Sequence, residues 1–423
     1  MWSMDKFVIT GPARLQGELT ISGAKNASLA MMPACLLAPG VSTLTNTPQN
    51  RDVDTFCRLL ETLGVRTHAQ GTTVTLDTSD IHSVEAPYEH VKKMRASIYV
   101  LGPLIARFGK ARVSLPGGCN FGPRPVDLHL RGLEALGAEI SVDSGYINAS
   151  TQGLQGGRFH FDVVSVGASV NVIMAAVLAR GRTVLTNVAL EPEVVAVAEM
   201  LVQMGAVIQG IGTTTLQIDG VEKLQPVQAV TIPDRIEAAT YLIAAAATQG
   251  DVTLHNVRAD HMTAILHALH QSGATVQQTG TSVRVCMDTT PAAVDITAAP
   301  YPGFPTDAQA QWAAYMLTAN GSATITDTIY PTRFGYVPEL QRLGAHITTG
   351  ESTCTVHGGA PLTGASVMSS DLRASASLVI AALLANGVSE ILRVYHLDRG
   401  YEVMEERLHA LGARVERQKT DEF

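Results

Sequence analysis

Charged side chains are scarce in this 423-residue sequence: they make up 16% of it, against roughly 25% in an average soluble domain. Hydrophobic residues make up 46%, which excludes a disordered chain and indicates much buried surface. The formal net charge is -8, so non-specific attraction to nucleic acid or to an anionic membrane is not expected. The chain is too long for one ordinary core, and its length predicts two or more large domains.

Cysteine is scarce as well. The five cysteines are scattered, odd in number and without C-x-x-C spacing, which argues against a disulfide framework or a zinc site and favours a reducing compartment. The N-terminus lacks a basic-then-apolar signal layout, and the apolar runs fall short of the about 20 residues that a transmembrane helix needs. We therefore expect a cytoplasmic protein.

Phosphate loops and metal motifs are missing too. The sequence has no G-x-x-x-x-G-K-[ST] loop, no dinucleotide fingerprint and no H-E-x-x-H helix. We expect no metal ion or other cofactor and no nucleic-acid or membrane partner. Because the chain is acidic overall, an anionic ligand would need a local cluster of basic residues.

What the sequence does have is a repeat. Six times, a helix pattern of small apolar residues is followed by a turn and a strand-like run, and then by a second, amphipathic helix pattern. The first helices and strands lie within 23–46, 94–117, 166–188, 233–257, 305–328 and 370–394. The second helices end at glycines suited to a left-handed C′ position, namely Gly64, Gly137, Gly205, Gly273, Gly344 and Gly412.

The two helix patterns predict two different environments. The first helix of each unit is apolar on almost every side and should be buried, whereas the second carries charge on one face and should be exposed to solvent. Alternating strands such as TTVTLDT and STCTVHG suit sheets with one buried face. We predict an α/β protein of six similar helix and strand units, three in each of two domains, with helices within and sheets outside.

Polar side chains recur at two places in these units. The heads of the buried helices carry Lys25, Asn26, Arg95, Ser165, Gly167, Ser169, Asp234, Arg235, Asp307, Asp371 and Arg373. The loops after the strands carry Cys119, Arg124, Asp127, His129, Arg333, Asp398 and Arg399. Helix N-termini favour anions, and arginine pairs bidentately with phosphate and carboxylate, so these recurring cations predict an anionic ligand.

Three of these residues need individual weighing. Cys119, in the stretch SLPGGCNFGPRPVDLHL at 114–130, is either a reactive thiol on a glycine-rich loop or an inert one, since most free cysteines are buried hydrophobes. Asp307 is by default an N-cap for the following helix, and alternatively a general base if a substrate hydroxyl lies within reach. We expect His129 to be a structural hydrogen-bonding residue rather than a catalyst.

Six motifs together resemble a known family: ISGAKNAS, MRASIYVLGPL, SLPGGC-x-x-G-x-RPVDLH, FPTD-x-QAQ, DLRASASL and YH-x-DRGYE. They resemble the enolpyruvyl transferases over essentially the whole chain, and most closely the members that act on UDP-N-acetylglucosamine. The resemblance implies two domains, 1–24 with 233–423 and 25–232, each an inverse α/β barrel of three repeats. It places the Cys119 loop in the second domain and the active-site cleft between the two.

The resemblance also implies a reaction. The enolpyruvyl group of phosphoenolpyruvate would pass to the 3′-hydroxyl of UDP-N-acetylglucosamine by addition and elimination, with release of phosphate. This would be the first committed step of peptidoglycan precursor synthesis, and it needs no metal ion. Phosphoenolpyruvate is a small trianion, so several cations are needed to offset its desolvation.

Residue roles follow from matching positions in the resemblance. Cys119 would be the acid at the vinyl methylene carbon, and Asp307 would take the proton of the attacking hydroxyl. Lys25, Arg124 and Arg399 would hold phosphoenolpyruvate, with Asn26 in contact with it and with the sugar. The UDP-sugar site would be lined by Arg95, Arg124, Pro125, Val126, Asp127, Leu128, Ser165, Val166, Gly167, Asp307 and Ile329. Supporting residues in or near the active site would be Asp371, Arg373, Arg333 and Arg342.

One position departs from the family pattern. Val163 stands where the family often has a lysine that assists the nucleotide, so this chain lacks a charge there. Two alternatives therefore remain beside the main interpretation. The chain could be an enolpyruvyl transferase for a different nucleotide, such as UMP, or a catalytically silent relative that only binds a nucleotide sugar.

Overall fold

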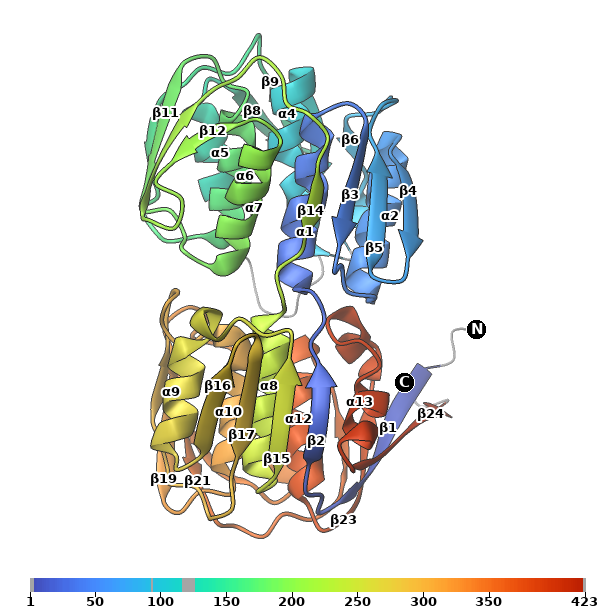
Figure 1. Cartoon of the computed structure of the whole chain (residues 1–423), viewed down its shortest axis with the longest axis vertical. Helices are drawn as coiled ribbons and strands as arrows, with labels where there is room; N and C mark the ends of the chain where they lie inside the picture. Colours follow the sequence, from blue (N-terminus) through green and yellow to red (C-terminus); the bar gives the residue numbers. More distant parts are fainter. Residues whose placement is uncertain (1–3, 93, 116–125, 421–423) are drawn as a thin grey trace. The chain divides into compact units, whose positions relative to one another are not determined.

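The computed structural model describes residues 4–92, 94–115 and 126–420. The chain divides into two compact units, which we call unit 1 (Met1–Ser22 with Pro233–Phe423) and unit 2 (Gly23–Ile232) (Figure 1). Unit 1 therefore contains both ends of the chain, and unit 2 is formed by the middle. No helix in the described part of the chain has the length and apolar character needed to cross a membrane.

The elements of unit 2 follow the predicted alternation of helices and strands. Its helices are α1 (Lys25–Ala34), η1 (Cys35–Leu37), α2 (Arg51–Leu63), α3 (Tyr88–Val91), η2 (Arg95–Val100), α4 (Leu101–Phe108), α5 (Asp127–Glu134), α6 (Val166–Ala176) and α7 (Pro192–Gln203). Its strands are β3 (Val41–Thr45), β4 (Arg66–Gln70), β5 (Thr73–Asp77), β6 (Glu85–Ala86), β7 (Lys110–Ser114), β8 (Glu139–Asp143), β9 (Tyr146–Ser150), β10 (Arg158–His160), β11 (Arg182–Thr186), β12 (Val207–Gln209), β13 (Thr215–Asp219) and β14 (Gln228–Val230).

Unit 1 has the same alternation. Its helices are α8 (Arg235–Ala247), η3 (Ala259–His261), α9 (Thr263–Gln271), η4 (Thr306–Ala308), α10 (Gln309–Met316), α11 (Val337–Arg342), α12 (Leu372–Leu384), η5 (Val394–Arg399) and α13 (Met404–Ala410). Its strands are β1 (Met4–Gly11), β2 (Gln16–Thr20), β15 (Asp251–His255), β16 (Thr275–Thr279), β17 (Ser282–Cys286), β18 (Ile296–Ala298), β19 (Ser322–Asp327), β20 (His346–Thr349), β21 (Thr353–His357), β22 (Ser366–Met368), β23 (Gly387–Leu392) and β24 (Arg414–Thr420).

The strands among the described residues form six four-stranded sheets with one common pattern. In each sheet, one edge strand runs parallel to its neighbour, and the remaining two pairings are antiparallel. The orders are β14-β3-β5-β4, β6-β7-β9-β8 and β10-β11-β13-β12 in unit 2, and β2-β15-β17-β16, β18-β19-β21-β20 and β22-β23-β1-β24 in unit 1. The predicted six units, three in each half, are confirmed.

Three sheets contain a strand from a distant part of the sequence, and in one of them β1 lies between β23 and β24. β2 pairs in parallel with β15, and β14 pairs in parallel with β3. In Figure 1, blue β2 lies beside yellow-green β15, and green β14 lies beside blue β3. The chain thus leaves unit 1 after β2 and returns after β14, with a parallel strand pair anchoring each crossing.

The first helices of the repeats are buried, as predicted. Every residue of α8 is buried, and α8, α10 and α12 pack against one another (Figure 1). Runs of alanine, such as residues 244–247 of α8, present little side-chain volume and allow the helix axes to approach closely. These three helices begin at the same end of unit 1, so their N-terminal residues gather there.

The second helices end as predicted. The six glycines at their C-termini all adopt positive φ angles, between 85° and 106°, which cost glycine little because it has no Cβ. The prediction that the second helix of each repeat faces solvent is wrong for α7. That helix buries eight of its twelve residues and packs against α1, because valine and alanine occupy nearly all of its faces.

Candidate active site

Asp307 lies at the head of an inner helix of unit 1, in η4 just before α10. Its Oδ1 accepts a hydrogen bond from Nη1 of Arg333 at 2.9 Å, and its Oδ2 accepts one from Nη2 of Arg373 at 3.0 Å. The two arginine side chains are 9% and 5% exposed, whereas that of Asp307 is 26% exposed. The carboxylate is therefore fixed between two cations while part of it stays accessible to a ligand.

The interpretation of Asp307 as an N-cap is wrong. The N-cap position of α10 is Ala308, which makes no side-chain capping bond. The Asp307 side chain pairs instead with arginines from distant parts of the sequence, and its backbone carbonyl accepts from Nε2 of Gln311 at 3.0 Å. Asp307 is therefore a charged group displayed at a helix head.

Arg373 reaches Asp307 because of where α12 begins. Asp371 is the N-cap of α12, and its Oδ1 accepts from the backbone N–H groups of Arg373 at 2.9 Å and Ala374 at 3.1 Å. The Nη1 of Arg373 also donates to the hydroxyl of Tyr401 at 3.3 Å. Burial by itself lowers the pKa of Arg373, but the negative charge of Asp307 and the hydrogen bond to Tyr401 outweigh it and raise that pKa above its usual value. The guanidinium therefore remains a cation.

Arg333 follows β19 and is tied to the head of α10, because its backbone carbonyl accepts from Nε2 of Gln309 at 2.8 Å. Ile329 lies in the preceding turn, where its N–H donates to Oδ1 of the buried Asp327 at 2.9 Å. Arg342 does not join this group: it ends α11, and its Nε donates to a backbone carbonyl of β22 at 3.1 Å.

Arg399 is the last residue of η5 and is half-buried. The neighbouring Asp398 accepts two hydrogen bonds from Arg417, at 2.6 and 3.2 Å, which tie η5 to β24. Burial lowers the pKa of His396 to about 4, and the nearby charge of Arg399 adds to that shift. Near neutral pH, η5 therefore carries a cation beside an uncharged imidazole.

Lys25 is the first residue of α1 in unit 2. Its Nζ lies 3.4 Å from Oδ2 of Asp52, and the two side chains are only 11% and 5% exposed. A charge buried to this degree requires an opposite charge nearby. Asn50 caps α2 by accepting from the N–H of Val53 at 3.0 Å, which sets where Asp52 lies in the first turn. Asn26 follows Lys25 and is half-buried.

The head of α6 is built from a capping serine and a close helix contact. The Oγ of Ser165 accepts from the N–H of Ala168 at 3.3 Å. Val166 and Gly167 form the first turn, where backbone N–H groups have no partner within the helix. A Cβ on Gly167 would lie 3.1 Å from ring atoms of His129, so glycine permits α5 to approach α6 here.

The heads of α5 and η2 carry the remaining predicted residues of unit 2. Val126 is the N-cap of α5, Asp127 is its first residue and is exposed, and Leu128 follows. Arg95 begins η2, and no carboxylate among the described residues pairs with it. Burial lowers the pKa of His129 to about 3, and the charge of Arg95 adds to the shift. This buried, uncharged imidazole confirms the structural role that we expected for His129.

Three predicted residues, Cys119, Arg124 and Pro125, lie outside the described residues, and their roles stay predictions. Two partners of predicted residues were missed, Asp52 and Tyr401. Asp52 lies in the first turn of α2, and Tyr401 lies two residues after Arg399 in the motif YH-x-DRGYE, but the local sequence does not show which residues they pair with.

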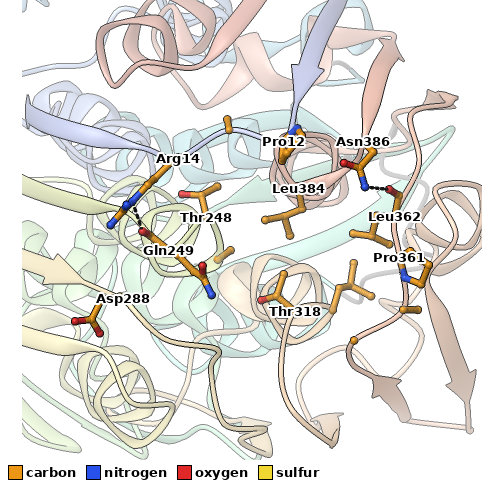
Figure 2. A pocket seen from close by; sticks show the side chains of 15 residues that line it. Pro12, Arg14, Thr248, Gln249, Asp288, Thr318, Pro361, Leu362, Leu384 and Asn386 are labelled. Carbon is orange, nitrogen blue, oxygen red and sulfur yellow. Dashed lines mark hydrogen bonds between the residues drawn. The ribbon is translucent and has the colours of Figure 1, made fainter.

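A cavity of about 530 Å³ lies at the other end of unit 1 (Figure 2). Ala247 of α8 and Leu384 of α12, both at helix C-termini, line it, together with Thr318 just after α10. A 13-residue helix such as α12 is about 20 Å long, which separates this cavity from Asp307. Across the described residues, no group of three or more His, Cys, Asp or Glu side chains could hold a metal ion.

Comparison with known proteins places this arrangement in a family. A family model described as EPSP synthase (3-phosphoshikimate 1-carboxyvinyltransferase) matches residues 9–408. The chain is 53% identical over 423 residues to UDP-N-acetylglucosamine 1-carboxyvinyltransferase of Chloroherpeton thalassium, covering 99% of each chain. It is 54% identical to the protein of the same name from Chlorobium phaeovibrioides, covering 99% of this chain and 100% of that one.

Solved structures share the architecture. The enolpyruvyl transferase NikO from Streptomyces tendae matches with a TM-score of 0.91 at 25% identity, over 99% of this chain and 100% of NikO. EPSP synthase from Acinetobacter baumannii matches with a TM-score of 0.76 at 19% identity, over 99% of this chain and 100% of that one, which shows the fold alone. The fold is the two-domain inverse α/β barrel built of six repeats. The chain therefore belongs to the EPSP synthase family of enolpyruvyl transferases.

Proposed function

We propose that this protein transfers the enolpyruvyl group of phosphoenolpyruvate to the 3′-hydroxyl of UDP-N-acetylglucosamine and releases phosphate, as a UDP-N-acetylglucosamine 1-carboxyvinyltransferase. The observation that carries the proposal is an identity of 51% to 54% along the whole chain to relatives of that name. The step would supply a precursor of peptidoglycan. The four described cysteines are free, which supports our expectation of a reducing, cytoplasmic location.

Asp307 is proposed as the base for the attacking hydroxyl. A general base must be deprotonated, accessible and fixed in direction. Arg333 and Arg373 favour the charged form of the carboxylate and fix both of its oxygens, and its partial exposure leaves room for a hydroxyl to approach. As the hydroxyl loses its proton to Asp307, its oxygen forms a bond to C2 of phosphoenolpyruvate.

Cys119 is proposed as the acid of the same step. Its proton would go to C3 while the new bond forms at C2, giving a tetrahedral ketal. In the second step the bond from C2 to the phosphate oxygen breaks, phosphate leaves with the bonding electrons, and C3 returns a proton to the Cys119 thiolate so that the double bond is restored. Lys25, Arg124 and Arg399 would stabilise the phosphate and carboxylate charges throughout, with Asn26 beside them.

The nucleotide sugar is proposed to bind at the helix heads of unit 2. The diphosphate is an anion, and two features there favour anions: the first turn of α6, and the charge of Arg95, with which no carboxylate of the described residues pairs. The predicted contacts in this unit are Arg95, Arg124, Pro125, Val126, Asp127, Leu128, Ser165, Val166 and Gly167. Ile329 and Asp307 of unit 1 are the remaining predicted contacts.

A second candidate function is the same transfer to a different nucleotide. Val163 is 66% exposed and lies two residues before the N-cap of α6. The preceding residue, Asp162, pairs with Arg131 at 2.7 Å, so the charge of this arginine is already matched by a carboxylate. An apolar, solvent-facing side chain next to the proposed nucleotide contacts is the observation that favours a different acceptor.

Phosphate release from phosphoenolpyruvate tests both candidates. Purified protein is offered UDP-N-acetylglucosamine, UMP or shikimate 3-phosphate, with no acceptor as the blank. We expect kcat/KM to be at least about tenfold higher for UDP-N-acetylglucosamine than for either alternative. Preference for UMP would favour the second candidate. Folded protein that releases phosphate with none of them would leave only the silent nucleotide-sugar binder.

A further inference from the structure

A single buried amide on α6 connects that helix to three other elements of unit 2. Asn171 lies in α6, two turns from its head, and is fully buried. Its Nδ2 donates to the carbonyl of Ile98 in η2 at 3.0 Å and to Nδ1 of His129 in α5 at 3.1 Å. Its Oδ1 accepts from the N–H of Gly102 in α4 at 2.6 Å.

The orientation of this amide is fixed by its neighbours. Reversing the Asn171 amide would set its oxygen against the Ile98 carbonyl and its NH2 group against the Gly102 N–H, so two attractive contacts would become repulsive. Both amide hydrogens and the oxygen are therefore committed. Because Nδ1 of His129 must accept, the neutral ring carries its proton on Nε2.

The side-chain amide of Asn171 interrupts the backbone hydrogen bonds of the helical segment that begins at Arg95. In a regular α-helix the N–H of Gly102 would donate to the carbonyl of Ile98, four residues earlier. Here the side-chain amide stands between these two groups, at the junction where η2 becomes α4. An insertion of this kind changes the direction of a helix. A Cβ on Gly102 would lie 2.3 Å from the Asn171 backbone oxygen, so the contact requires glycine.

Of the four elements connected in this way, η2, α5 and α6 carry the described residues that we propose for the nucleotide sugar in unit 2. η2 begins with Arg95, α5 begins with Asp127, and Ser165 caps α6. His129 is two residues beyond Asp127 and touches Gly167 in the first turn of α6. One amide thus sets the direction of η2, the ring position on α5 and the spacing between α5 and α6.

We propose that Asn171 is a positioning residue for the nucleotide-sugar acceptor, holding the heads of η2, α5 and α6 in the arrangement that binds it. The proposal rests on the proposed function for the identity of that acceptor. Asn171 itself is buried beneath the heads and acts through Arg95, His129 and Gly167. Its loss should therefore weaken acceptor binding much more than it weakens phosphoenolpyruvate binding.

Steady-state kinetics of Asn171→Leu tests this division. Leucine has a similar size and removes all three hydrogen bonds. We expect KM for UDP-N-acetylglucosamine to rise at least about tenfold, as misplaced binding groups produce, and KM for phosphoenolpyruvate to change less than about threefold. The matched control is Ile173→Ala, an equally buried position on the same helix that leaves the three bonds in place. Equal changes in both KM values, no change, or the same selectivity in the control would overturn the proposal.

A second pair of variants covers the case in which Asn171→Leu does not fold. His129→Asn keeps an acceptor near the place of Nδ1, and His129→Leu removes it. The KM for the acceptor should stay closer to that of the wild type in His129→Asn than in His129→Leu. The reverse order, or equal values, would contradict a role for the bond between Asn171 and His129.

A measurement without turnover separates this proposal from the proposed function. Nitrogen NMR of histidine-labelled wild-type protein should show His129 with its proton on Nε2 and uncharged down to pH 5. The conservative charge variant Asn171→Asp should move the proton to Nδ1 and raise the pKa of the ring, since a carboxylate accepts and stabilises a positive charge. A wild-type ring protonated on Nδ1 would overturn the proposal even if the enzyme is fully active. Inactivity toward every acceptor with the expected spectrum would instead count against the proposed function.

Discussion

Two inner helices, α6 of unit 2 and α10 of unit 1, carry a buried amide at the same place in the repeat. Asn171 and Gln311 are both fully buried. Each lies ten residues before a glycine with positive φ, Gly181 and Gly321 respectively. The Nε2 of Gln311 donates to the backbone carbonyl of Asp307 at 3.0 Å and to Oγ1 of Thr240 at 3.2 Å. Each amide therefore links helix heads within its own unit.

The two amides differ in how completely they are used. Asn171 engages both of its hydrogens and its oxygen, whereas Oε1 of Gln311 is enclosed without a partner among the described residues. In unit 1 the heads are held chiefly by the ion pairs of Asp307 with Arg333 and Arg373. In unit 2 the heads of η2, α5 and α6 are held by the neutral hydrogen bonds of Asn171, and no carboxylate of the described residues pairs with Arg95.

This difference matches the proposed chemistry of each unit. A group that exchanges a proton must keep its charge and direction, and ion pairs supply both at a desolvation cost. A surface that binds an anion gains from unpaired cations and helix N-termini, which an internal ion pair would neutralise. Charge is thus matched around Asp307 in unit 1, whereas in unit 2, beside the matched pair of Lys25 and Asp52, the charge of Arg95 is left available.

The largest effect should come from removing the charge in unit 1. In Asp307→Asn we expect kcat to fall about 10²- to 10⁴-fold, the usual contribution of a general base, with phosphoenolpyruvate binding largely kept. Phosphate release and phosphoenolpyruvate titration measure the two quantities. The matched control is Asp251→Asn, which likewise removes a carboxylate held by two arginine hydrogen bonds, in this case both from Arg284 on the neighbouring strand of the same unit. Unchanged turnover in Asp307→Asn would remove this residue as the base.

The sequence predicts the repeats well because their signals are local. The apolar helices and the six C′ glycines depend on residues within a few turns, and the structure confirms them. The pairing of Asp307 with Arg373 was not predicted, since 66 residues separate them, and a carboxylate before a helix has the same sequence signature as an N-cap. The bond between His129 and Asn171 spans 42 residues and escapes local patterns in the same way.

Acidification to pH 5 should lower the free energy of unfolding of unit 2, relative to that of unit 1, by about 2 kcal/mol. The pKa of His129 is about 3 in the fold against 6.5 ordinarily, so below pH 6.5 the unfolded chain binds the extra proton and unit 2 loses stability as pH falls. The loss is about 1.4 kcal/mol for each pH unit below 6.5, so His129 lowers the stability of unit 2 by about 2 kcal/mol at pH 5. In unit 1, His396 acts in the same direction, with a pKa of about 4.

Unit 1 has an opposing group. Burial raises the pKa of Glu237 from 4.5 to about 7, against the lowering effect of Arg407, so the folded state binds the extra proton and its contribution to stability grows as pH falls from 7 to 4.5. Hydrogen-exchange protection in α6 should therefore fall between pH 7 and pH 5, while protection in α8 should stay nearly constant. The His129→Asn variant should remove the slope in α6. Parallel loss in both helices would contradict this contrast.

The smallest effect should come from Gln311→Met, which tests the contrast between the two amides directly. Methionine fills a similar volume, and the variant loses the Nε2 bonds but also removes the enclosed, unpartnered Oε1, which by itself costs about 1–3 kcal/mol. Thr240 and Tyr401 keep their mutual hydrogen bond at 2.8 Å. The free energy of unfolding should therefore change by less than about 1 kcal/mol in urea titrations, whereas Asn171→Leu leaves the Gly102 N–H and the His129 ring without partners and should cost about 2–5 kcal/mol. If both variants lost the same free energy of unfolding, the amide of Gln311 would have to be as fully hydrogen-bonded as that of Asn171. Removing a side chain is this costly only when its polar groups had partners in the fold.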